Sequence, residues 1–393
     1  MEDLKNNDEI ISKEMWERID EEDKDNEAIN RKSLTYFQDS WRRLKKNKLA
    51  MIGLGVVVLL ILIAIFGPLF SPYSYSDQNL RFASLSPRLG LHKISDNTYV
   101  HLASGLKLYI TSKDGKVLKL LDPIKQDVIK KNKVYEINGE KVIVDFSKKP
   151  FDLLNESGDQ FPYYKKVWNK TYYLGSDDLG RDVLVRVIYG ARISLLIAFI
   201  ATIVNFFIGI LYGGISGYAG GKVDNIMMRI VDIISTVPLM LYVILLMVVL
   251  GSGLKPIIIA LGSVYWVQMA RIVRGQVLSL KEEEYVMSAR VIGASHFRIL
   301  LRHLLPNAMG PIIVSMTMMI PRAIFVEAFL SFIGLGVSAP KASWGTLAND
   351  ALASLRSYPY QLFSPAIAIC ITMLAFNFLG DGLRDALDPR LRK

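Results

Sequence analysis

The sequence has one cysteine and four histidines among 393 residues. The single thiol, Cys370, has no partner for an internal disulfide, so any exposed domain must fold without such crosslinks. The histidines include no i, i+4 pair with a carboxylate partner, the spacing of a helical zinc site. We therefore predict no metal site, no catalytic residues and no cofactor in this chain.

Charged residues are also few, at 21% of the chain against 51% hydrophobic residues, and the net charge is +10. The charges gather in the termini and between about residues 75 and 175, while the apolar residues form long uncharged runs. This composition excludes a disordered chain, a collagen-like repeat and a disulfide-rich secreted protein. It predicts a protein that crosses the membrane several times, whose positive charge reflects basic cytoplasmic loops rather than nucleic-acid binding.

Six segments have the length and apolar character of membrane spans: residues 49–70, 193–217, 233–254, 256–270, 307–340 and 357–380. The fourth is short, so flanking residues must complete it. The first is too long and too far from the N-terminus for a cleaved signal peptide, and it is predicted to be a retained signal anchor. Basic loops alternate with nearly uncharged ones, which places both termini in the cytoplasm and the long segment 71–190 outside.

The external segment has the pattern of a small β domain. Strand-like stretches at residues 99–102, 106–111, 117–121 and 133–146 are interrupted by the turn pairs Asp114-Gly115 and Asn138-Gly139. The predicted fold is an all-α polytopic membrane protein with six transmembrane helices and an inserted small β-rich extracellular domain. Its predicted regions are a solvated tail (1–33), an amphipathic segment with the first transmembrane helix (34–75), the β-rich insertion (76–170), and a core of five transmembrane helices (171–393) that includes a loop at 281–306.

The loop 281–306 is the most informative polar segment. Five of its residues share one helical face: Tyr285, Ala289, Ile292, Gly293 and His296. Because residues such as Ser288 and Gly293 are small, another surface can approach the helix backbone closely on part of this face. Pro306 disfavours helical geometry at Leu305, and a new segment begins at Asn307. The pattern predicts two short helices that either bind a cytoplasmic partner or lie on the lipid surface.

Two charged residues, Arg322 and Glu327, lie within a predicted span, where charge is costly and often functional. They are five positions apart, about 140° around a helix, so no mutual ion pair is expected. Both are candidate pathway or gating residues, and a proton-coupling role for Glu327 stays open. The glycine-rich segment 216–222 departs from a P-loop, since Ser216 occupies its first position and Val223 follows Lys222. The chain is therefore not expected to be an enzyme that hydrolyses ATP.

Charge clusters flank two of the spans. Before the second span lie Asp177, Asp178, Arg181 and Asp182, which either cap and dock its outer end or form a solvated loop. On the next cytoplasmic turn, Lys222, Asp224, Arg229 and Asp232 alternate in sign. We interpret this second cluster as self-satisfied charge, and a partner contact is the alternative.

The order Met287-Ser288-Ala289, Gly293 and Leu305-Pro306 resembles the coupling loop of ABC importer permeases. It departs from the usual motif at Met287, which replaces an acidic residue, and at Ser288, which replaces an alanine. Blocks at 40–54, 174–195, 327–337 and 379–392 resemble the C-type permease of oligopeptide and dipeptide importers. The resemblance does not cover 76–170, because such permeases usually have a much shorter loop there.

The resemblance implies one permease subunit of an ATP-driven peptide importer in a prokaryotic plasma (inner) membrane. It implies a second homologous permease, two ABC ATPases that carry ATP and Mg, and an extracellular or periplasmic peptide-binding protein as partners. The coupling residues it implies are Tyr285, Ser288, Ala289, Gly293, Leu305 and Pro306. An ion-coupled secondary transporter and a ligand sensor are the alternatives, and the length and identity of the peptide stay open.

Overall fold

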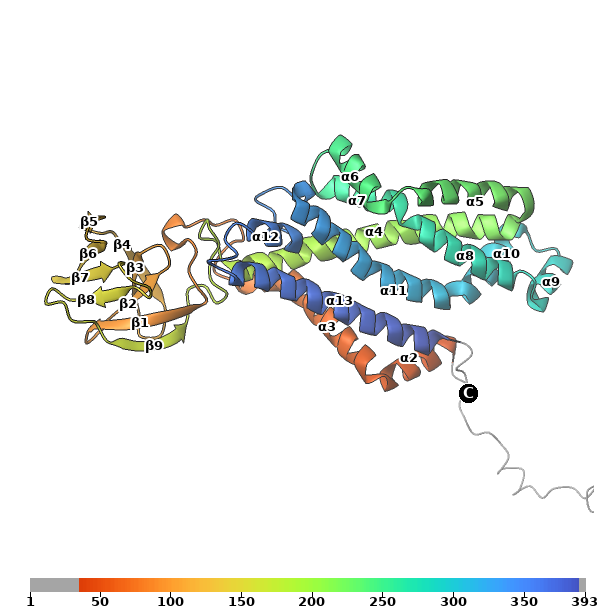
Figure 1. Ribbon diagram of the computed structural model, residues 1–393. Helices are drawn as coiled ribbons and strands as arrows, with labels where there is room; N and C mark the ends of the chain where they lie inside the picture. The colour runs from red at the N-terminus through yellow and green to blue at the C-terminus, as the bar shows by residue number, and fades with distance from the viewer. Residues whose placement is uncertain (1–34, 389–393) are drawn as a thin grey trace, which may run out of the picture.

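The structure is a computed structural model that describes residues 35–388, without the side chains of Tyr36 and Leu239. The predicted tail 1–33 lies outside the described residues. The described chain is elongated: strands form one end, long and roughly aligned helices form the rest, and α9 (Glu284–Val291) and α10 (His296–Ile299) lie at the far end (Figure 1). The other helical elements are α2 (Tyr36–Lys46), α3 (Lys48–Phe66), η2 (Gly67–Phe70), η3 (Leu80–Phe82), α4 (Val183–Ala219), α5 (Gly221–Thr236), α6 (Leu239–Leu250), α7 (Leu254–Val264), α8 (Trp266–Leu280), η4 (Leu300–Leu304), α11 (Leu305–Leu330), η5 (Ser331–Leu335), α12 (Trp344–Asp350) and α13 (Tyr360–Leu387).

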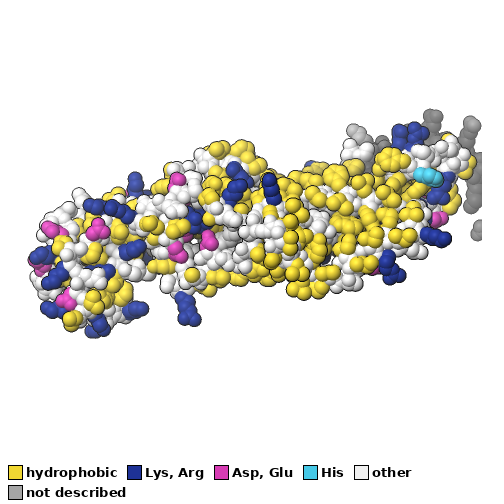
Figure 2. Space-filling view, turned by 90° about the horizontal axis from the view of Figure 1, so that it is seen from above, with side chains coloured by type: hydrophobic (Ala, Val, Ile, Leu, Met, Phe, Trp, Pro, Cys, Tyr) yellow, Lys and Arg dark blue, Asp and Glu magenta, His cyan; other side chains and the backbone are white. Residues whose placement is uncertain are grey.

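Within the described residues, five helical segments are long and apolar enough to cross a membrane: Lys48–Phe70, Val183–Ala219, Leu254–Leu280, His296–Leu335 and Tyr360–Leu387. A bent pair, Gly221–Thr236 and Met240–Leu250, makes a sixth if it counts as one span. These segments overlap the six predicted ones, and the short fourth run is completed by flanking residues. Figure 2 shows charged side chains gathered toward the two ends of the molecule, with a largely hydrophobic stretch over the helices between them.

The third span is broken by 83° at Pro238, a break that its apolar composition does not reveal. The ring of a proline disfavours α-helical geometry at the preceding residue. Val237 accordingly has extended dihedral angles, with φ −79° and ψ 125°, and α5 ends before it. The backbone between α5 and α6 is therefore non-helical.

The α4 helix is the central element of the bundle and packs against α3, α8, α11 and α13. Gly209, Gly213 and Gly217 recur at four-residue spacing on the side that faces α8. A Cβ atom at Gly213 would overlap the backbone of Ala270, and one at Gly209 would overlap the side chain of Met269. Small residues at this spacing allow two membrane helices to pack backbone to backbone.

The expectation that Pro306 separates two segments is wrong. Leu305 has α-helical dihedral angles, and it begins α11 with Pro306 in the first helical turn. Proline is tolerated there, because the first amides of a helix need no intrahelical acceptor. The π-helical turn η4 precedes Leu305, so His296–Leu335 is one continuous helical segment.

The strands form two antiparallel sheets. The first has the order β4-β3-β2-β1-β9 and the second β5-β6-β7-β8. The strands are β1 (Arg88–Ser95), β2 (Thr98–Ala103), β3 (Lys107–Thr111), β4 (Val117–Leu121), β5 (Lys125–Asp127), β6 (Asn132–Ile137), β7 (Glu140–Asp145), β8 (Asp152–Leu154) and β9 (Tyr163–Trp168). Asn138 and Gly139 both have positive φ and join β6 to β7, as predicted for a two-residue hairpin. Sequence patterns gave no signal for β1, β5, β8 or β9.

The strand region is joined to the helices by close contacts. The ring of Tyr75 stacks on Tyr189 of α4 with centroids 3.7 Å apart. The hydroxyl of Tyr360, at the start of α13, donates to the carbonyl oxygen of Ser176 at 2.8 Å. The Oγ of Ser176 in turn accepts from the amide of Leu85 at 2.8 Å, just before the first strand. Polar contacts thus connect α13 to both chain segments that flank the sheets.

Candidate functional site

The α9–α10 pair is shaped by the turn between its helices. Gly293 has a φ of +87°, a left-handed conformation that glycine adopts at little cost. The amides of Gly293 and Ala294 donate to the carbonyl oxygens of Arg290 and Ala289, which ends α9 in the manner of a Schellman motif. The side chain of Ser295 then accepts from a backbone amide and caps α10.

This turn overturns the prediction of one helical face from Tyr285 to His296. Tyr285 and Ala289 lie on α9, but Ile292 is its cap, Gly293 lies in the turn and His296 begins α10. The left-handed backbone of Gly293 changes the chain direction, so periodicity does not continue through it. His296 instead forms a hydrogen bond through Nδ1 with the hydroxyl of Tyr218 near the end of α4, at 2.8 Å.

Apolar side chains of this pair divide into a buried set and an exposed set. The buried set continues into η4 and anchors the pair to α8 and α11: Val286, Ile299, Leu300 and Leu304. The exposed set, here termed the apolar tip, consists of Val291, Ile292 and Phe297, whose exposed fractions are 87%, 86% and 69%. The apolar tip is therefore attached to the bundle through buried residues, and no other part of the described chain covers it.

The other residues of the predicted coupling motif surround the apolar tip and its anchor. Tyr285, Met287 and Ser288 are exposed on α9, while Ala289 is half-buried. Leu305 is buried in the anchoring cluster, and Pro306 is exposed beside it. Val291 was missed by sequence reasoning, although an isolated apolar pair directly before a glycine was a usable signal.

Glu327 is fully buried and surrounded by hydroxyl groups. Its carboxylate accepts from Ser194 of α4 and from Ser331 of η5, each at 2.8 Å. Ser331 Oγ also accepts from the hydroxyl of Ser343, which caps α12. Glu327 thus ties α11 to three neighbouring elements.

Arg322 lies on α11 and does not pair with Glu327. The absence of an ion pair agrees with the prediction from the angular separation of the two residues around the helix. Its Nη1 donates to Oε1 of Gln268, on α8, at 2.7 Å. The side chain borders a cavity that also contacts α5, α8 and α13. The two intramembrane charges therefore have separate environments.

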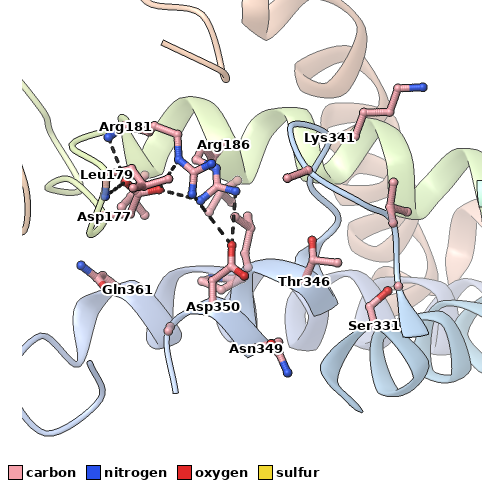
Figure 3. Close-up of a pocket in the computed structure, with 18 of the residues that line it drawn as sticks. Asp177, Leu179, Arg181, Arg186, Ser331, Lys341, Thr346, Asn349, Asp350 and Gln361 are labelled. Atoms are coloured by element: carbon pink, nitrogen blue, oxygen red, sulfur yellow. Dashed lines mark hydrogen bonds and ion pairs between the residues drawn. The ribbon is translucent and has the colours of Figure 1, made fainter. Parts of the chain in front are cut away.

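A second cavity, of about 490 Å³, lies at the strand-proximal end of the bundle (Figure 3). Asp177 accepts from Arg181 at 2.7 Å and from Arg186 at 2.6 Å, and Arg186 also contacts Asp350 of α12 at 3.4 Å. Figure 3 shows the two arginines between these carboxylates. These contacts dock α12 onto the start of α4, one of the roles predicted for this charged loop.

Asp182 performs the other predicted role. It caps α4 by accepting hydrogen bonds from the amides of Leu184 and Val185, at 2.8 and 3.3 Å. Burial raises the pKa of Asp182 to about 6, although these two hydrogen bonds favour its charged form. Asp178 contacts the hydroxyl of Ser84, at 3.1 Å, in the segment before the sheets.

The interpretation of the alternating charges after α4 as self-satisfied is wrong for the two carboxylates, because both pair with arginines of α8 rather than with Lys222 or Arg229. Asp224 accepts two hydrogen bonds from Arg274 of α8, each at 2.6 Å. Asp232 of α5 lies 3.0 Å from Arg271, which is also on α8. Both pairs fix α5 against α8.

Comparisons with known proteins agree with this architecture. A family model described as the binding-protein-dependent transport system inner membrane component matches residues 209–393, and one described as the N-terminal TM domain of oligopeptide transport permease C matches residues 35–87. The oligopeptide transport system permease protein OppC of Bacillus subtilis (strain 168) is 43% identical over 383 residues, 98% of this chain and 99% of that protein. The chain belongs to the permease C family of oligopeptide and dipeptide transport systems. This permease is accordingly a multi-pass membrane protein from a family of permease subunits rather than of ATPases.

Two further relatives differ in how much of this permease they match, which bears on the strand segment 76–170. The dipeptide transport system permease protein DppC of the same B. subtilis strain is 42% identical over 95% of this permease and 92% of its own length. OppC of Escherichia coli (strain K12) is 41% identical over 62% of this permease and 83% of its own length. The B. subtilis OppC match includes almost all of residues 76–170, so the expectation of a much shorter loop is wrong for that relative.

A solved chain of the inward-facing MetNI methionine ABC transporter aligns with this permease at a TM-score of 0.45 and 19% identity. The alignment covers 52% of this permease and 97% of that chain.

Proposed function

We propose that this permease and a second homologous permease form the translocation pathway of an ATP-driven importer for oligopeptides or dipeptides. Two cytoplasmic ATPases carry ATP and Mg, and an external peptide-binding protein delivers the substrate. The observation that carries the proposal is the apolar tip of Val291, Ile292 and Phe297 on an anchored helix pair. Such a group of exposed apolar side chains is typical of a protein interface.

The orientation in the membrane follows from charge. The α9–α10 end carries the basic residues Lys281, Arg290, Arg298 and Arg302, and an excess of basic residues in short loops marks the cytoplasmic side. The strands lie at the opposite end of the bundle (Figure 1), and this arrangement supports an external position for segment 76–170. Both termini are then cytoplasmic, and the membrane is the prokaryotic plasma membrane.

The coupling of ATP hydrolysis to transport follows from the packing that attaches the apolar tip to the bundle. ATP-driven closure of the ATPases displaces the α9–α10 pair, and its buried residues pass the displacement to α8 and α11. Because the bundle is closely packed, it responds by changing between two arrangements, open inward or outward. Met287 lies exposed where the family motif has an acidic residue, so the ATPase surface facing it has no carboxylate to bind.

The partners are tested by purifying the tagged chain from native membranes in mild detergent and identifying co-purified proteins by mass spectrometry. We expect a second six-span permease and two P-loop ATPases. Recovery of the chain alone, or as a homodimer without an ATPase after mild crosslinking, would contradict the proposal.

A further inference from the structure

An open cavity of about 880 Å³ lies on the side of the helix bundle, at the break in the third span. Its lining comes from the α5–α6 junction and from α8, α11 and α13, and includes Pro238, Gln268, Arg322 and Asn377. Gln268 lies near the middle of the span Leu254–Leu280, so the cavity lies at mid-depth in the membrane. Its volume is in the range of cavities that hold small organic ligands.

The polar lining carries one cation that lacks a carboxylate partner in the described chain. Arg271 is balanced by Asp232 at 3.0 Å and also contacts Ser235 at 2.9 Å. Arg322 donates only to the neutral amide of Gln268, at 2.7 Å, which leaves other N–H groups of the guanidinium for a ligand. A guanidinium at this depth is costly unless it faces a polar cavity, and its planar fork matches a carboxylate.

The broken helix adds backbone groups to the same wall. At the end of α5 the last carbonyl oxygens lose their intrahelical amide donors, and Val237 and Pro238 are non-helical. Two carbonyl oxygens at this junction already accept hydrogen bonds, that of Ile233 from the hydroxyl of Thr236 and that of Pro238 from the amide of Tyr242. Non-helical backbone at membrane depth is tolerated where it lines a polar cavity. The junction therefore presents acceptors suited to the amide groups of a peptide.

The rest of the lining is apolar and adaptable. Met318 and Met373 have flexible, polarisable side chains that fit groups of different shape, and Phe325 and Tyr265 add aromatic surface. A fixed cation beside an adaptable apolar wall matches a ligand with one constant anionic group and variable side chains. We propose that Arg322 binds the C-terminal carboxylate of the peptide as it passes through the permease, an inference that rests on the proposed function.

The test compares uptake of one labelled peptide in two forms, with a free C-terminus and with a C-terminal amide, by the complete transporter. The preference of the binding protein is the same for every variant, so it cancels when each variant is divided by the wild type. We expect Arg322→Gln to lower uptake of the free acid about tenfold relative to its effect on the amide, because a charge-assisted hydrogen bond is lost. Arg322→Lys, which keeps the charge but not the fork, should show a smaller selective loss.

Arg271→Gln is the matched control, because it removes a cation from the same cavity that already has a carboxylate partner. It should change uptake of both forms by the same factor, and all rates are divided by the amount of assembled complex. Equal losses of acid and amide in Arg322→Gln would overturn the inference, as would no loss, and equal losses would favour an ion pair with the second permease. Uptake of either form by the wild type tests the proposed function separately.

Discussion

Gly293 is the residue on which the geometry of the α9–α10 turn depends. Its φ of +87° is strained for any residue with a Cβ atom, although no atom lies within 4 Å of the place such an atom would take. Gly293→Ala should therefore strain the turn by about 1 kcal/mol and uncouple ATP hydrolysis from uptake without removing a contact. The measurement is the number of peptides imported per ATP hydrolysed.

Gly275→Ala is the control for this substitution. Gly275 also has open space around it, but it lies within α8 with ordinary helical φ, where alanine is favoured. Coupling should be unchanged in that variant. An equal effect of the two substitutions would contradict the role assigned to the Gly293 backbone.

His101 is the residue through which we expect acid to destabilise the strand region. Burial lowers the pKa of His101 from its usual value of 6.5, and burial also lowers the pKa of His92. Nδ1 of His101 donates to the carbonyl oxygen of Gly90 at 3.0 Å, whereas Nε2 is buried and lacks a partner among the described residues. Protonation would place a second N–H where no acceptor lies.

The direction in which stability changes with pH follows from proton uptake on unfolding. Below about pH 6.5 the exposed histidines of the unfolded region bind protons that the folded region does not, so stability is full above this pH and falls as the pH decreases. We expect faster hydrogen exchange in β1 and β2 at pH 5.5 than at pH 7.5, after correction for the intrinsic rate. His101→Asn, whose amide can still donate to Gly90, should reduce that difference, and an undiminished difference would contradict the assignment.

At the scale of elements, Glu327 holds four helical segments in register. Glu327→Ala leaves the hydroxyls of Ser194 and Ser331 buried without their acceptor, which should lower the stability of the complex by about 2 kcal/mol. Glu327→Gln keeps an acceptor of the same size and should cost less than half as much. Thermal unfolding in detergent measures both variants.

The same pair of variants separates structure from proton coupling. If Glu327 acts as a structural acceptor, Glu327→Gln retains ATP-driven uptake. A Gln variant that folds but does not transport would show that ionisation itself is required.

Elements defined by local pattern could be predicted from the sequence, and those defined by distant contacts could not. The spans and the Asn138-Gly139 hairpin follow from runs and turn residues that lie close together in the chain. The helical continuity through Pro306 depends on a π-helical turn, and the contact of Arg186 with Asp350 joins residues 164 positions apart. No pattern of residue spacing along the sequence predicts contacts between residues so far apart.

The candidate sites divide in the same way. The segment 281–306 could be singled out because a motif places Gly293 and Leu305-Pro306 in order along the chain, and its role in coupling stays a prediction. The hydroxyl environment of Glu327 and the cavity beside Arg322 form only when α4, α8, α11 and α13 pack. The sequence could indicate that these two charges matter, but not what surrounds them.

At the scale of the whole molecule, the apolar tip and the strand region lie at opposite ends of one closely packed bundle (Figure 1). The α4 helix has 37 residues, about 55 Å at 1.5 Å per residue, and it contacts elements at both ends. We therefore expect displacement of the apolar tip to pass along α4 to α12 and to the cavity at the strand-proximal end of the bundle. The central claim is that ATPases on the cytoplasmic side drive peptide import through this connection.

The most direct test is uptake of a labelled peptide by proteoliposomes that contain the assembled transporter, with the wild type compared to Ile292→Glu and Ile129→Glu. Ile129 is 94% exposed on the strand region, so its substitution adds the same charge to an exposed isoleucine far from the tip. We expect uptake that needs ATP and survives collapse of ion gradients, unchanged in Ile129→Glu and lost together with ATPase binding in Ile292→Glu. Uptake that continues without ATP and stops when an ion gradient collapses, or normal ATP-driven uptake in Ile292→Glu, would contradict the account.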